Sequence, residues 1–492
     1  MPNPPKTYRA GTLTYTKAGL ALLFFWLLWG DFCFFMTESI PHIIPLKFKD
    51  LHCPEFMIGL ILATIPRSIG AVCNPIISFR SDRCRSRWGR RIPFILVTMP
   101  FLVMSFIGIG CSFDIGRFLY PRLHAWIQNP GMLEFLTQET VILIVLSVFL
   151  VCFDFFNTFV SSVFWYLFND VVPEEFLARF MSWFRVVIMI TGIIYNKFVF
   201  PHSDIYFKQM FIGGGLLYLF GFGSMCLMVK EGEYPPPPEN DDGKKGIVSS
   251  MKTYARECMS LRHYWFVFLI AITGSFGGAC GIFNSIFQRN IMGLTLQDIG
   301  NLGVAGAVAC AIYVPIAGWL ADKYHPIRVV LWGMVLNVLV QPVGFIWLFW
   351  HASPAAYFKF TFLQSILLGC PIGMLLQTDI PMLMKLFPRE RYGQFCSCRA
   401  MLGMITGIVT GTLGGAFISF LKHFYDERTA YCLIPGWTLF FTSISLVFMI
   451  KLFRSWQCYG GDTHYVPPLP VHLEGEVSSA AASCSSVSGG HG

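Results

Sequence analysis

The sequence contains a series of apolar stretches, each about 20 residues or longer, separated by short polar segments. A helix rises 1.5 Å per residue, so about 20 apolar residues cross the roughly 30 Å hydrocarbon core of a bilayer. Only 13% of the residues are charged, against roughly 25% in an ordinary soluble domain. We therefore predict an all-α membrane protein with about twelve transmembrane helices. The predicted spans are 18–46, 55–79, 93–112, 139–168, 180–200, 209–229, 263–288, 299–320, 327–350, 355–384, 393–421 and 432–453.

An arginine-rich segment at residues 80–95 fixes the predicted orientation. It lies between two apolar stretches and carries a single acid, Asp82. Such a cluster is too polar for hydrocarbon, so it must be a loop, and positively charged short loops stay in the cytoplasm. Lysine and arginine are also more frequent in the other loops that fall on the same side. Both termini are therefore predicted to be cytoplasmic. The arginines are Arg80, Arg83, Arg85, Arg87, Arg90 and Arg91.

A long polar segment between the sixth and seventh spans divides the chain. It contains four consecutive prolines, Pro235–Pro238, and proline-rich polar sequence forms semi-rigid or disordered linkers. The end of the chain is rich in serine, alanine and glycine, which predicts disorder. The expected units are a cytoplasmic lead at 1–17, a six-helix half at 18–229, a cytoplasmic loop at 230–262, a second six-helix half at 263–454 and a disordered cytoplasmic tail at 455–492.

Composition and motifs exclude several classes of function. The net charge of +8 is concentrated in short loops, as a topology signal requires, so we expect no nucleic-acid partner. Most of the 16 cysteines lie inside apolar stretches and are expected to be packing residues rather than disulfides or metal ligands. No nucleotide-binding loop, His-Glu-x-x-His or Gly-x-Ser-x-Gly motif is present in the sequence. We therefore expect neither an enzyme nor a resident cofactor.

The two predicted halves share matching loops. An acid followed by a base comes after the second span, Asp82-Arg83, and again after the eighth, Asp322-Lys323. The loops after the fourth and tenth spans also correspond: when Pro173 is aligned with Pro388, Phe180 falls on Phe395. Two parallel six-helix halves with matching loops are typical of a duplicated transporter.

This pattern resembles the major facilitator superfamily over about residues 18–455. The string from Asp82 to Ile95 is similar to that of sucrose–proton symporters and of glycoside–pentoside–hexuronide cation symporters. The resemblance implies alternating access, with cytoplasmic salt bridges that form and break. The expected gate residues are Asp82, Arg83, Gly89, Arg90, Arg91, Asp170, Arg179, Arg185, Gly318, Asp322, Lys323, Arg328 and Asp379.

Ionisable residues inside the spans need a role or a partner, because each costs about 2.5–3.5 kcal/mol at the membrane centre. Asp31 and Glu38 are seven residues apart and share one helix face; Asp154 and Asn157 form a stripe on the fourth span. Desolvation raises the pKa of a carboxyl group and a nearby arginine lowers it. We therefore consider Asp31, Glu38 and Asp154 candidates for binding a proton or cation. The alternative is a structural ion pair of Asp31 or Asp154 with Arg67.

A sugar would present C–H faces to aromatic rings and hydroxyl groups to amides and acids. Aromatic residues make up 16% of the chain, so packing or lipid contact is the alternative for any single ring. The substrate-binding candidates are Trp29, Asn157, Trp165, Asn284, Gln288 and Gln364.

The sequence therefore predicts a secondary active transporter for a sugar or glycoside, in symport with protons or sodium. The coupling ion is the only cofactor expected. We expect a multi-pass protein of the plasma or inner membrane that functions as a monomer in the lipid bilayer. The alternatives are a uniporter, an exporter of another organic solute, or a membrane sensor without transport.

Overall fold

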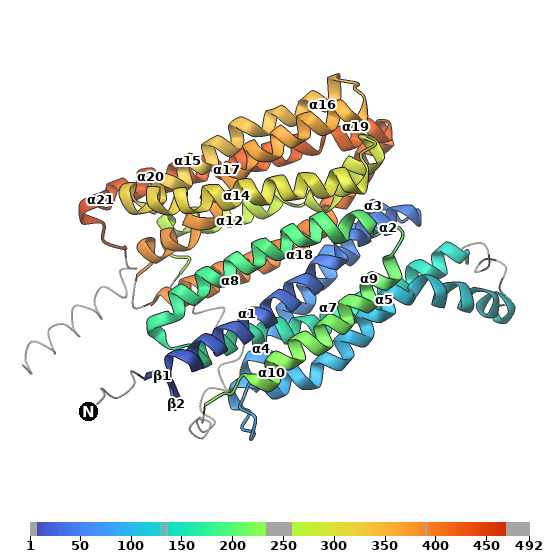
Figure 1. Ribbon diagram of the computed structural model, residues 1–492. Coiled ribbons are helices and arrows are strands. Elements are labelled where there is room, and N and C mark those ends of the chain that lie inside the picture. The colour runs from blue at the N-terminus through green and yellow to red at the C-terminus, as the bar shows by residue number, and fades with distance from the viewer. Residues whose placement is uncertain are drawn as a thin grey trace, which may run out of the picture.

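The structure is a computed structural model that describes residues 7–127, 129, 131, 133, 136–232, 258–388 and 391–468. For residues 78, 79, 82, 83, 169, 178, 463 and 464 it describes the backbone alone. Helices account for nearly all of the described chain (Figure 1). Twelve segments among these residues are long and apolar enough to cross a membrane, which confirms the predicted number of spans.

The first group of elements begins with a two-stranded antiparallel hairpin and continues with the helices of the first six spans. We call this the α1–α10 group. Its elements are β1 (Tyr8–Ala10), β2 (Leu13–Tyr15), α1 (Lys17–Ser39), η1 (Ile40–Ile43), α2 (Ile44–Asp50), α3 (Glu55–Gly59), η2 (Leu60–Thr64), α4 (Ile65–Arg83), α5 (Ile92–Trp126), α7 (Gln138–Val171), α8 (Glu174–Ile194), η3 (Tyr195–Val199), η4 (Phe200–His202), α9 (Phe207–Leu217), η5 (Tyr218–Phe222) and α10 (Gly223–Met228).

The second group supplies the other six spans and is called the α12–α21 group. Its elements are α12 (Arg262–Gly277), η7 (Gly281–Phe283), α13 (Asn284–Ile286), η8 (Phe287–Ile291), α14 (Leu296–Tyr324), α15 (Pro326–Val340), η9 (Gln341–Phe345), α16 (Ile346–Phe349), α17 (Pro354–Leu386), α18 (Tyr392–Phe424), α19 (Glu427–Cys432), α20 (Ile434–Cys458) and α21 (Gly461–His464).

Side-chain caps and proline explain several helix ends. The hydroxyl of Thr16 accepts a hydrogen bond from the backbone N–H of Gly19 at the start of α1, and Thr295 and Asp298 form a reciprocal capping box at the start of α14. Such caps satisfy N–H groups that the first helical turn leaves free. The boundary between α14 and α15 falls at His325, whose φ is 69°, and Pro326 follows as the first residue of α15.

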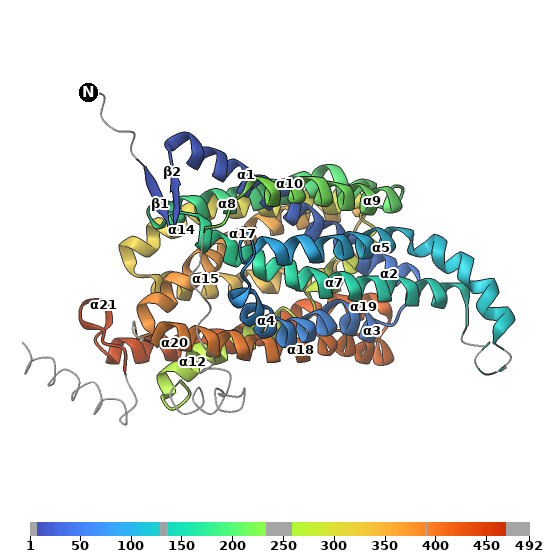
Figure 2. The same cartoon turned by 90° about the horizontal axis from the view of Figure 1, so that it is seen from below.

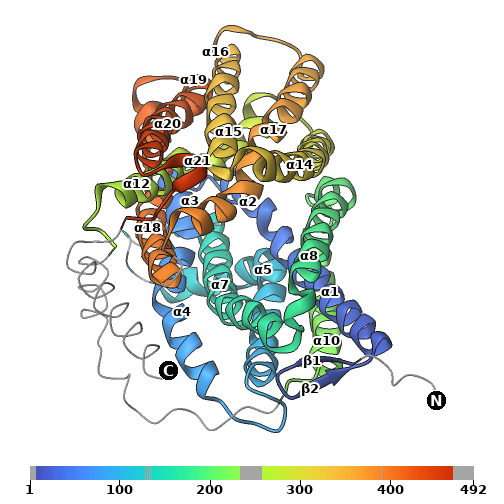
Figure 3. The ribbon, with the colours of Figure 1, turned by 90° about the vertical axis from the view of Figure 1, so that its left-hand side faces the viewer.

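The two groups of helices lie side by side in Figures 1 and 3. The hairpin and α21 lie at one end of the bundle, which we call the terminal end; α2, α3, α16 and α19 lie at the other, the distal end (Figures 1 and 2). Between the groups, α18 packs against α3, η2 and α4, while α14 packs against α8, η3 and η4.

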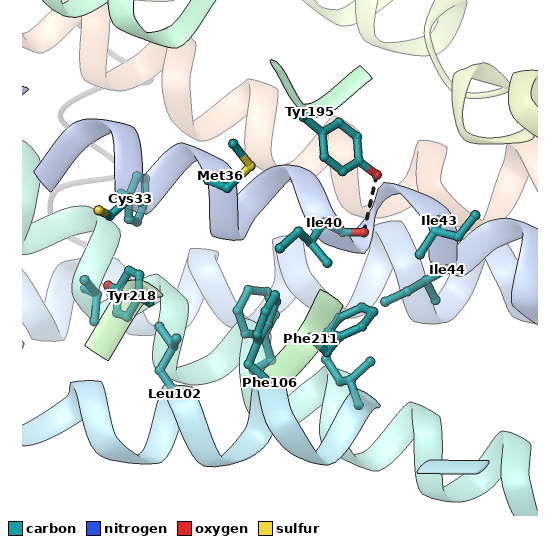
Figure 4. Close-up of a cluster of buried hydrophobic side chains, with 14 of the residues drawn as sticks. Cys33, Met36, Ile40, Ile43, Ile44, Leu102, Phe106, Tyr195, Phe211 and Tyr218 are labelled. Carbon is teal, nitrogen blue, oxygen red and sulfur yellow. Dashed lines mark hydrogen bonds between the residues drawn. The ribbon is translucent and has the colours of Figure 1, made fainter. Parts of the chain in front are cut away.

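Aromatic and aliphatic side chains fill the interior of the α1–α10 group. The ring centroid of Phe106 lies 4.8 Å from that of Phe211, and Tyr195 donates a hydrogen bond to the carbonyl of Ile40 at 3.5 Å (Figure 4). The side chains of Phe106, Phe211 and Tyr195 are buried, as is that of Phe34 near the centre of α1. The ring contacts connect α1, α5, α7 and α9 into one core, so these helices are fixed relative to one another.

Two stretches differ from the sequence prediction. Helix α5 continues to Trp126, beyond the predicted span end at residue 112, because polar residues end a membrane span without ending a helix. We expected residues 455–492 to be a disordered tail. In the described part of that range, α20 continues to Cys458, and the Tyr465 hydroxyl lies 3.1 Å from Nε2 of His263. This part is therefore docked on the bundle. Residues 1–6, 233–257 and 469–492 of the predicted lead, loop and tail lie outside the described residues.

Glycines allow close contact between the two groups at the distal end. A Cβ atom on Gly59 would lie 2.3 Å from the carbonyl oxygen of Gly411, and one on Gly415 would lie 2.2 Å from the carbonyl oxygen of Glu55. Backbone meets backbone at both places, so no side chain can move aside. The absence of a side chain at these positions therefore sets how closely α18 approaches α3.

We predict that Gly415→Ala lowers the free energy of unfolding by about 1–3 kcal/mol, the usual cost of an overpacked contact. Gly403→Ala is the matched control on the same helix, because a Cβ there would meet nothing within 4 Å. The measurement is thermal unfolding of the purified protein. Equal unfolding of the two variants would contradict the close contact.

Candidate functional site

A cavity of about 570 Å³, mostly apolar but with several polar groups in its lining, belongs mainly to the α1–α10 group. Its walls come from α1, η1, α2, η2, α7 and α8, and Ile282 of the α12–α21 group also lines it. Glu38 and His42 lie one helical turn apart, as do Asp154 and Asn157. All four side chains line this cavity, which we call the Glu38–Asp154 cavity.

The amide of Asn157 connects the two walls, donating a hydrogen bond from Nδ2 to Oε1 of Glu38 at 3.0 Å. Neither lysine nor arginine is among the residues that line the cavity. Two carboxyl groups therefore face one space without a cationic side chain beside them. Like charges in a poorly solvated site oppose each other, and such a pair readily binds a proton or a cation. The sequence prediction of a polar stripe on the fourth span thus leads to a site shared with the first span.

Asp31 lies two turns from Glu38 towards the terminal end and is fully buried. Both of its carboxyl oxygens lack a hydrogen-bond partner within the described part of the chain. Two residues on its face of α1, Phe24 and Phe35, pack against Phe180 and Phe184 of α8. Asp31 is therefore a buried carboxyl group on the face of α1 that packs aromatic rings against α8, and burying a polar group without a partner there is costly.

The predicted pairing of Arg67 with Asp31 or Asp154 is not among the contacts of the described residues. Arg67 instead donates a hydrogen bond from Nη1 to the carbonyl oxygen of Gly407 on α18 at 3.1 Å. A Cβ on Gly407 would lie 2.6 Å from Cδ of Arg67, so the guanidinium stem lies directly against the helix backbone. Arg67 therefore connects the two groups of helices rather than neutralising a buried acid.

The other substrate-binding candidates lie in three different places. Trp29 lines a small apolar hollow with Phe25 and Phe32, and Trp165 packs at 4.9 Å from Phe184. The remaining three candidates line a separate cavity of about 420 Å³ in the α12–α21 group. They are Asn284, Gln288 and Gln364. Among the six candidates, only Asn157 lines the cavity that holds Glu38 and Asp154.

At the terminal end, the predicted gate residues of the first repeat form a connected cluster. Arg90 and Arg91 both donate from Nε to Oδ2 of Asp170, at 2.9 and 3.1 Å. The carboxylate of Glu231 accepts hydrogen bonds from the backbone N–H groups of Arg90, Arg91 and Ile92 at the start of α5, where negative charge is favoured. Gly89 has φ 102°, and a Cβ there would collide with Glu231. The side chains of Asp82 and Arg83 lie outside the described part of the structure.

The second repeat is arranged differently. Lys323 lies 5.0 Å from the ring centroids of Trp319 and Tyr324, and Asp322 is exposed. Arg328 pairs with Asp462 after the last span. Arg90 and Arg91 thus pair with an acid after the fourth span, whereas Arg328 pairs with an acid after the last.

The remaining gate candidates lie on three helices, α8, α14 and α17. Arg399 donates to both carboxyl oxygens of Asp379 at 2.9 Å, and Arg185 donates to Gln377 across the two groups at 3.2 Å. Arg179 lies 5.7 Å from the ring of Phe176, and a Cβ on Gly318 would approach Gln377 to 3.5 Å.

An ion-pair network at the distal end was not predicted from the sequence. Glu55 accepts hydrogen bonds from Lys49 and Lys422, both at 2.8 Å, and from the Tyr431 hydroxyl at 3.2 Å. Lys49 also lies 2.7 Å from Glu427. We call these five residues the Glu55 network. Nearby, Arg289 pairs with Asp50 and Asp204. The available signal in the sequence was the acids close to these lysines: Glu55 follows Lys49, and Glu427 follows Lys422, within six residues.

Comparisons with known proteins agree with this architecture. A profile of the family described as MFS/sugar transport protein matches residues 49–387. Sucrose transport protein SUT5 of Oryza sativa subsp. indica is 50% identical over 50 residues, which are 10% of this chain and 9% of that protein. Sucrose transport protein SUC3 of Arabidopsis thaliana is 46% identical over 50 residues, 10% of this chain and 8% of that protein. The matched segment thus spans about a tenth of these relatives.

Two solved structures show the same fold. A bacterial homologue of the human lysosomal transporter Spinster, inward-facing and unoccupied, has 13% identity and a TM-score of 0.64, covering 92% of this chain and 100% of its own. The nucleoside transporter NupG has 12% identity and a TM-score of 0.58, covering 88% of this chain and 98% of its own. At such low identity the likeness establishes the fold alone, that of major facilitator transporters.

We predict that Glu55→Ala lowers the free energy of unfolding by about 1.5–3 kcal/mol, because two lysines and a tyrosine lose a charged acceptor. Glu139→Ala is the control: Glu139 is exposed, contacts only the exposed His52 among the described side chains, and should change stability by about 0.5 kcal/mol or less. Thermal or denaturant unfolding measures both. If the Glu55→Ala variant is as stable as the control, the Glu55 network contributes nothing to the free energy of unfolding.

Proposed function

Because this chain belongs to the MFS/sugar transport protein family, we propose that it is a secondary transporter for a sugar or glycoside, working in symport with protons. The observation that carries the proposal is the Glu38–Asp154 cavity, in which two carboxyl groups face one space without a cationic neighbour. The names of the plant relatives, sucrose transport proteins, support a saccharide as the solute.

Proton coupling follows from the chemistry of this cavity. With both groups ionised, the carboxylates of Glu38 and Asp154 repel each other and lack a counter-ion; a proton on one of them relieves that repulsion. A hydroxyl-rich solute then meets the carboxyl oxygens and the amide of Asn157 as hydrogen-bond partners.

Asp31 serves as a second proton-binding group in this proposal. Its carboxyl oxygens have no partner within the described chain, and an ionised group without a partner is costly in such surroundings. A proton held there keeps α1 neutral along the face that packs on α8. Its exchange requires α1 and α8 to separate, which ties this proton to a change of conformation.

We propose that both termini are cytoplasmic, as the loop charges predict, and that the distal end faces outward. Ion pairs between the two groups of helices close the distal end: Lys49–Glu427, Lys422–Glu55 and Arg289–Asp50. Nearer the terminal end, Arg185 donates a hydrogen bond to Gln377 across the groups. The distal ion pairs support an inward-facing state with its outer side closed.

Alternating access then requires the two groups, residues 18–229 and 263–454, to rock against each other. Opening the outer side breaks the Glu55 network and separates the glycine contacts of α18 from α3. The Arg90–Arg91–Asp170 cluster joins elements of one group only, so it moves as a unit. We propose that the protein functions as a monomer in the plasma or inner membrane.

The first test of transport is accumulation of labelled sucrose, and of other labelled saccharides, in proteoliposomes under an imposed proton gradient. One pH unit is worth 1.36 kcal/mol, so a one-to-one symporter with the membrane potential clamped at zero accumulates solute up to about tenfold per unit. If the uptake of every saccharide tested is the same with and without a proton or sodium gradient, symport is refuted.

The second test is Asp154→Asn, which removes the proton-binding carboxyl but keeps its shape. We expect gradient-driven accumulation to fall to the equilibrium level, while exchange of labelled for unlabelled saccharide without a gradient continues. Asp114→Asn is the matched control, because Asp114 is exposed on α5 and paired with Lys208; it should accumulate solute like wild type. Normal accumulation by the folded Asp154→Asn variant would remove Asp154 from the coupling site.

A further inference from the structure

A second cavity, of about 420 Å³, lies inside the α12–α21 group. We call it the Gln364 cavity. Its walls come from α12 to η8, η9, α17 and α20. Ile282 lines the Glu38–Asp154 cavity, whereas Gly281 and Asn284 line the Gln364 cavity. The segment from Gly281 to Gln288 therefore contributes side chains to both cavities.

The lining of the Gln364 cavity carries no charged side chain. Four carboxamides line it. That of Gln341 donates to Oδ1 of Asn337 at 3.1 Å, whereas those of Asn284, Gln288 and Gln364 have no hydrogen-bond partner within the described part of the chain. Each carboxamide offers two N–H donors and a carbonyl acceptor. The cavity thus contains three neutral groups with unused hydrogen-bonding capacity, in contrast to the acidic first cavity.

The hydroxyl groups around these amides are already committed as donors. Thr361 donates to the carbonyl of Tyr357 at 2.8 Å, Ser365 to that of Thr361 at 2.9 Å, and Thr438 to that of Gly277 at 3.2 Å. The amides are therefore the donors that remain for a ligand. Phe287 and the buried ring of Trp347 supply apolar wall beside them.

A break in the seventh span shapes this cavity. Helix α12 ends at Gly277 and helical structure resumes at Gly281. Trp437 donates from Nε1 to the carbonyl of Phe276 at 2.7 Å, so a group freed by the break has a partner. A Cβ on Gly281 would meet nothing within 4 Å. Irregular backbone at membrane depth is tolerated where it lines a cavity, and broken helices often border binding sites in transporters.

We propose that the Gln364 cavity is a second binding site, for a neutral, hydroxyl-rich solute such as a mono- or disaccharide. The amides bind the hydroxyl groups and the rings of Phe287 and Trp347 cover a C–H face. The volume is within the range of roughly 300–1,000 Å³ found for small-molecule sites. Because the lining is uncharged, binding here does not depend on the protonation of Glu38 and Asp154. The inference concerns binding alone, so it does not require the proposed transport cycle.

The test is equilibrium binding of labelled sucrose and glucose to the full-length protein in lipid nanodiscs, at pH 5.5 and 8. Asn157→Leu is introduced first to weaken the Glu38–Asp154 cavity. We expect saccharide binding to persist in this background with the same affinity at both pH values. Adding Gln288→Leu or Gln364→Leu should weaken it about tenfold, the equivalent of one lost hydrogen bond. Gln297→Leu is the control, because Gln297 is exposed on α14.

Folding of each variant is checked by thermal unfolding. The proposal is overturned if the Asn157→Leu protein binds neither saccharide, if its binding changes with pH, or if the Gln288 and Gln364 variants bind like the Gln297 control. Failure of gradient-driven uptake with this binding intact would refute transport and leave the second site standing. Normal gradient-driven uptake without this binding would refute the second site and leave transport standing.

Discussion

Hydrocarbon offers no hydrogen bonds, so every polar group that these helices carry inward must find its partner within the protein. Most of them do. Glu55 is surrounded by three donors and Asp170 by two arginines. Against that background the groups without partners are conspicuous: Asp31 on the face of α1 that packs against α8, and three amides of the Gln364 cavity. The second proton-binding group and the second binding site proposed for this protein both concern these unsatisfied groups.

The polar interior is also divided by depth. Ion pairs lie towards the two ends of the bundle, while the Glu38–Asp154 cavity holds two acids and His42 but neither lysine nor arginine. The charges at the ends are therefore paired, whereas the two acids of the cavity have no lysine or arginine beside them. Glycine contacts reinforce the distal closure, since α18 approaches α3 until backbone meets backbone at Gly59 and Gly415. Arg67, hydrogen-bonded to the carbonyl of Gly407, extends that contact towards the middle of the bundle.

The sequence was sufficient for features that depend on local pattern. Span number follows from apolar length, and the shared face of Asp154 and Asn157 follows from helical periodicity. It was insufficient wherever periodicity is interrupted. The helix breaks between Gly277 and Gly281, so helical periodicity no longer predicts which way the residues after the break face. Asn284 and Gln288 line a different cavity from Asn157. Glu231 caps α5 but is more than a hundred residues away in the sequence from the residues whose N–H groups it accepts. No local sequence pattern predicts such a contact.

The Glu55 network has a consequence for the environment in which the protein works. Its outer pair, Lys49–Glu427, has an exposed carboxylate, and ions in solution weaken exposed charge pairs, with a screening length of about 8 Å at physiological ionic strength. The buried carboxylate of Glu55 is screened much less, and the glycine contacts beside it are steric and insensitive to salt. Dilute surroundings therefore strengthen the outer part of the network. In the orientation and transport cycle that we propose, the salinity of the outer medium then affects how often the protein opens, apart from any gradient that drives it.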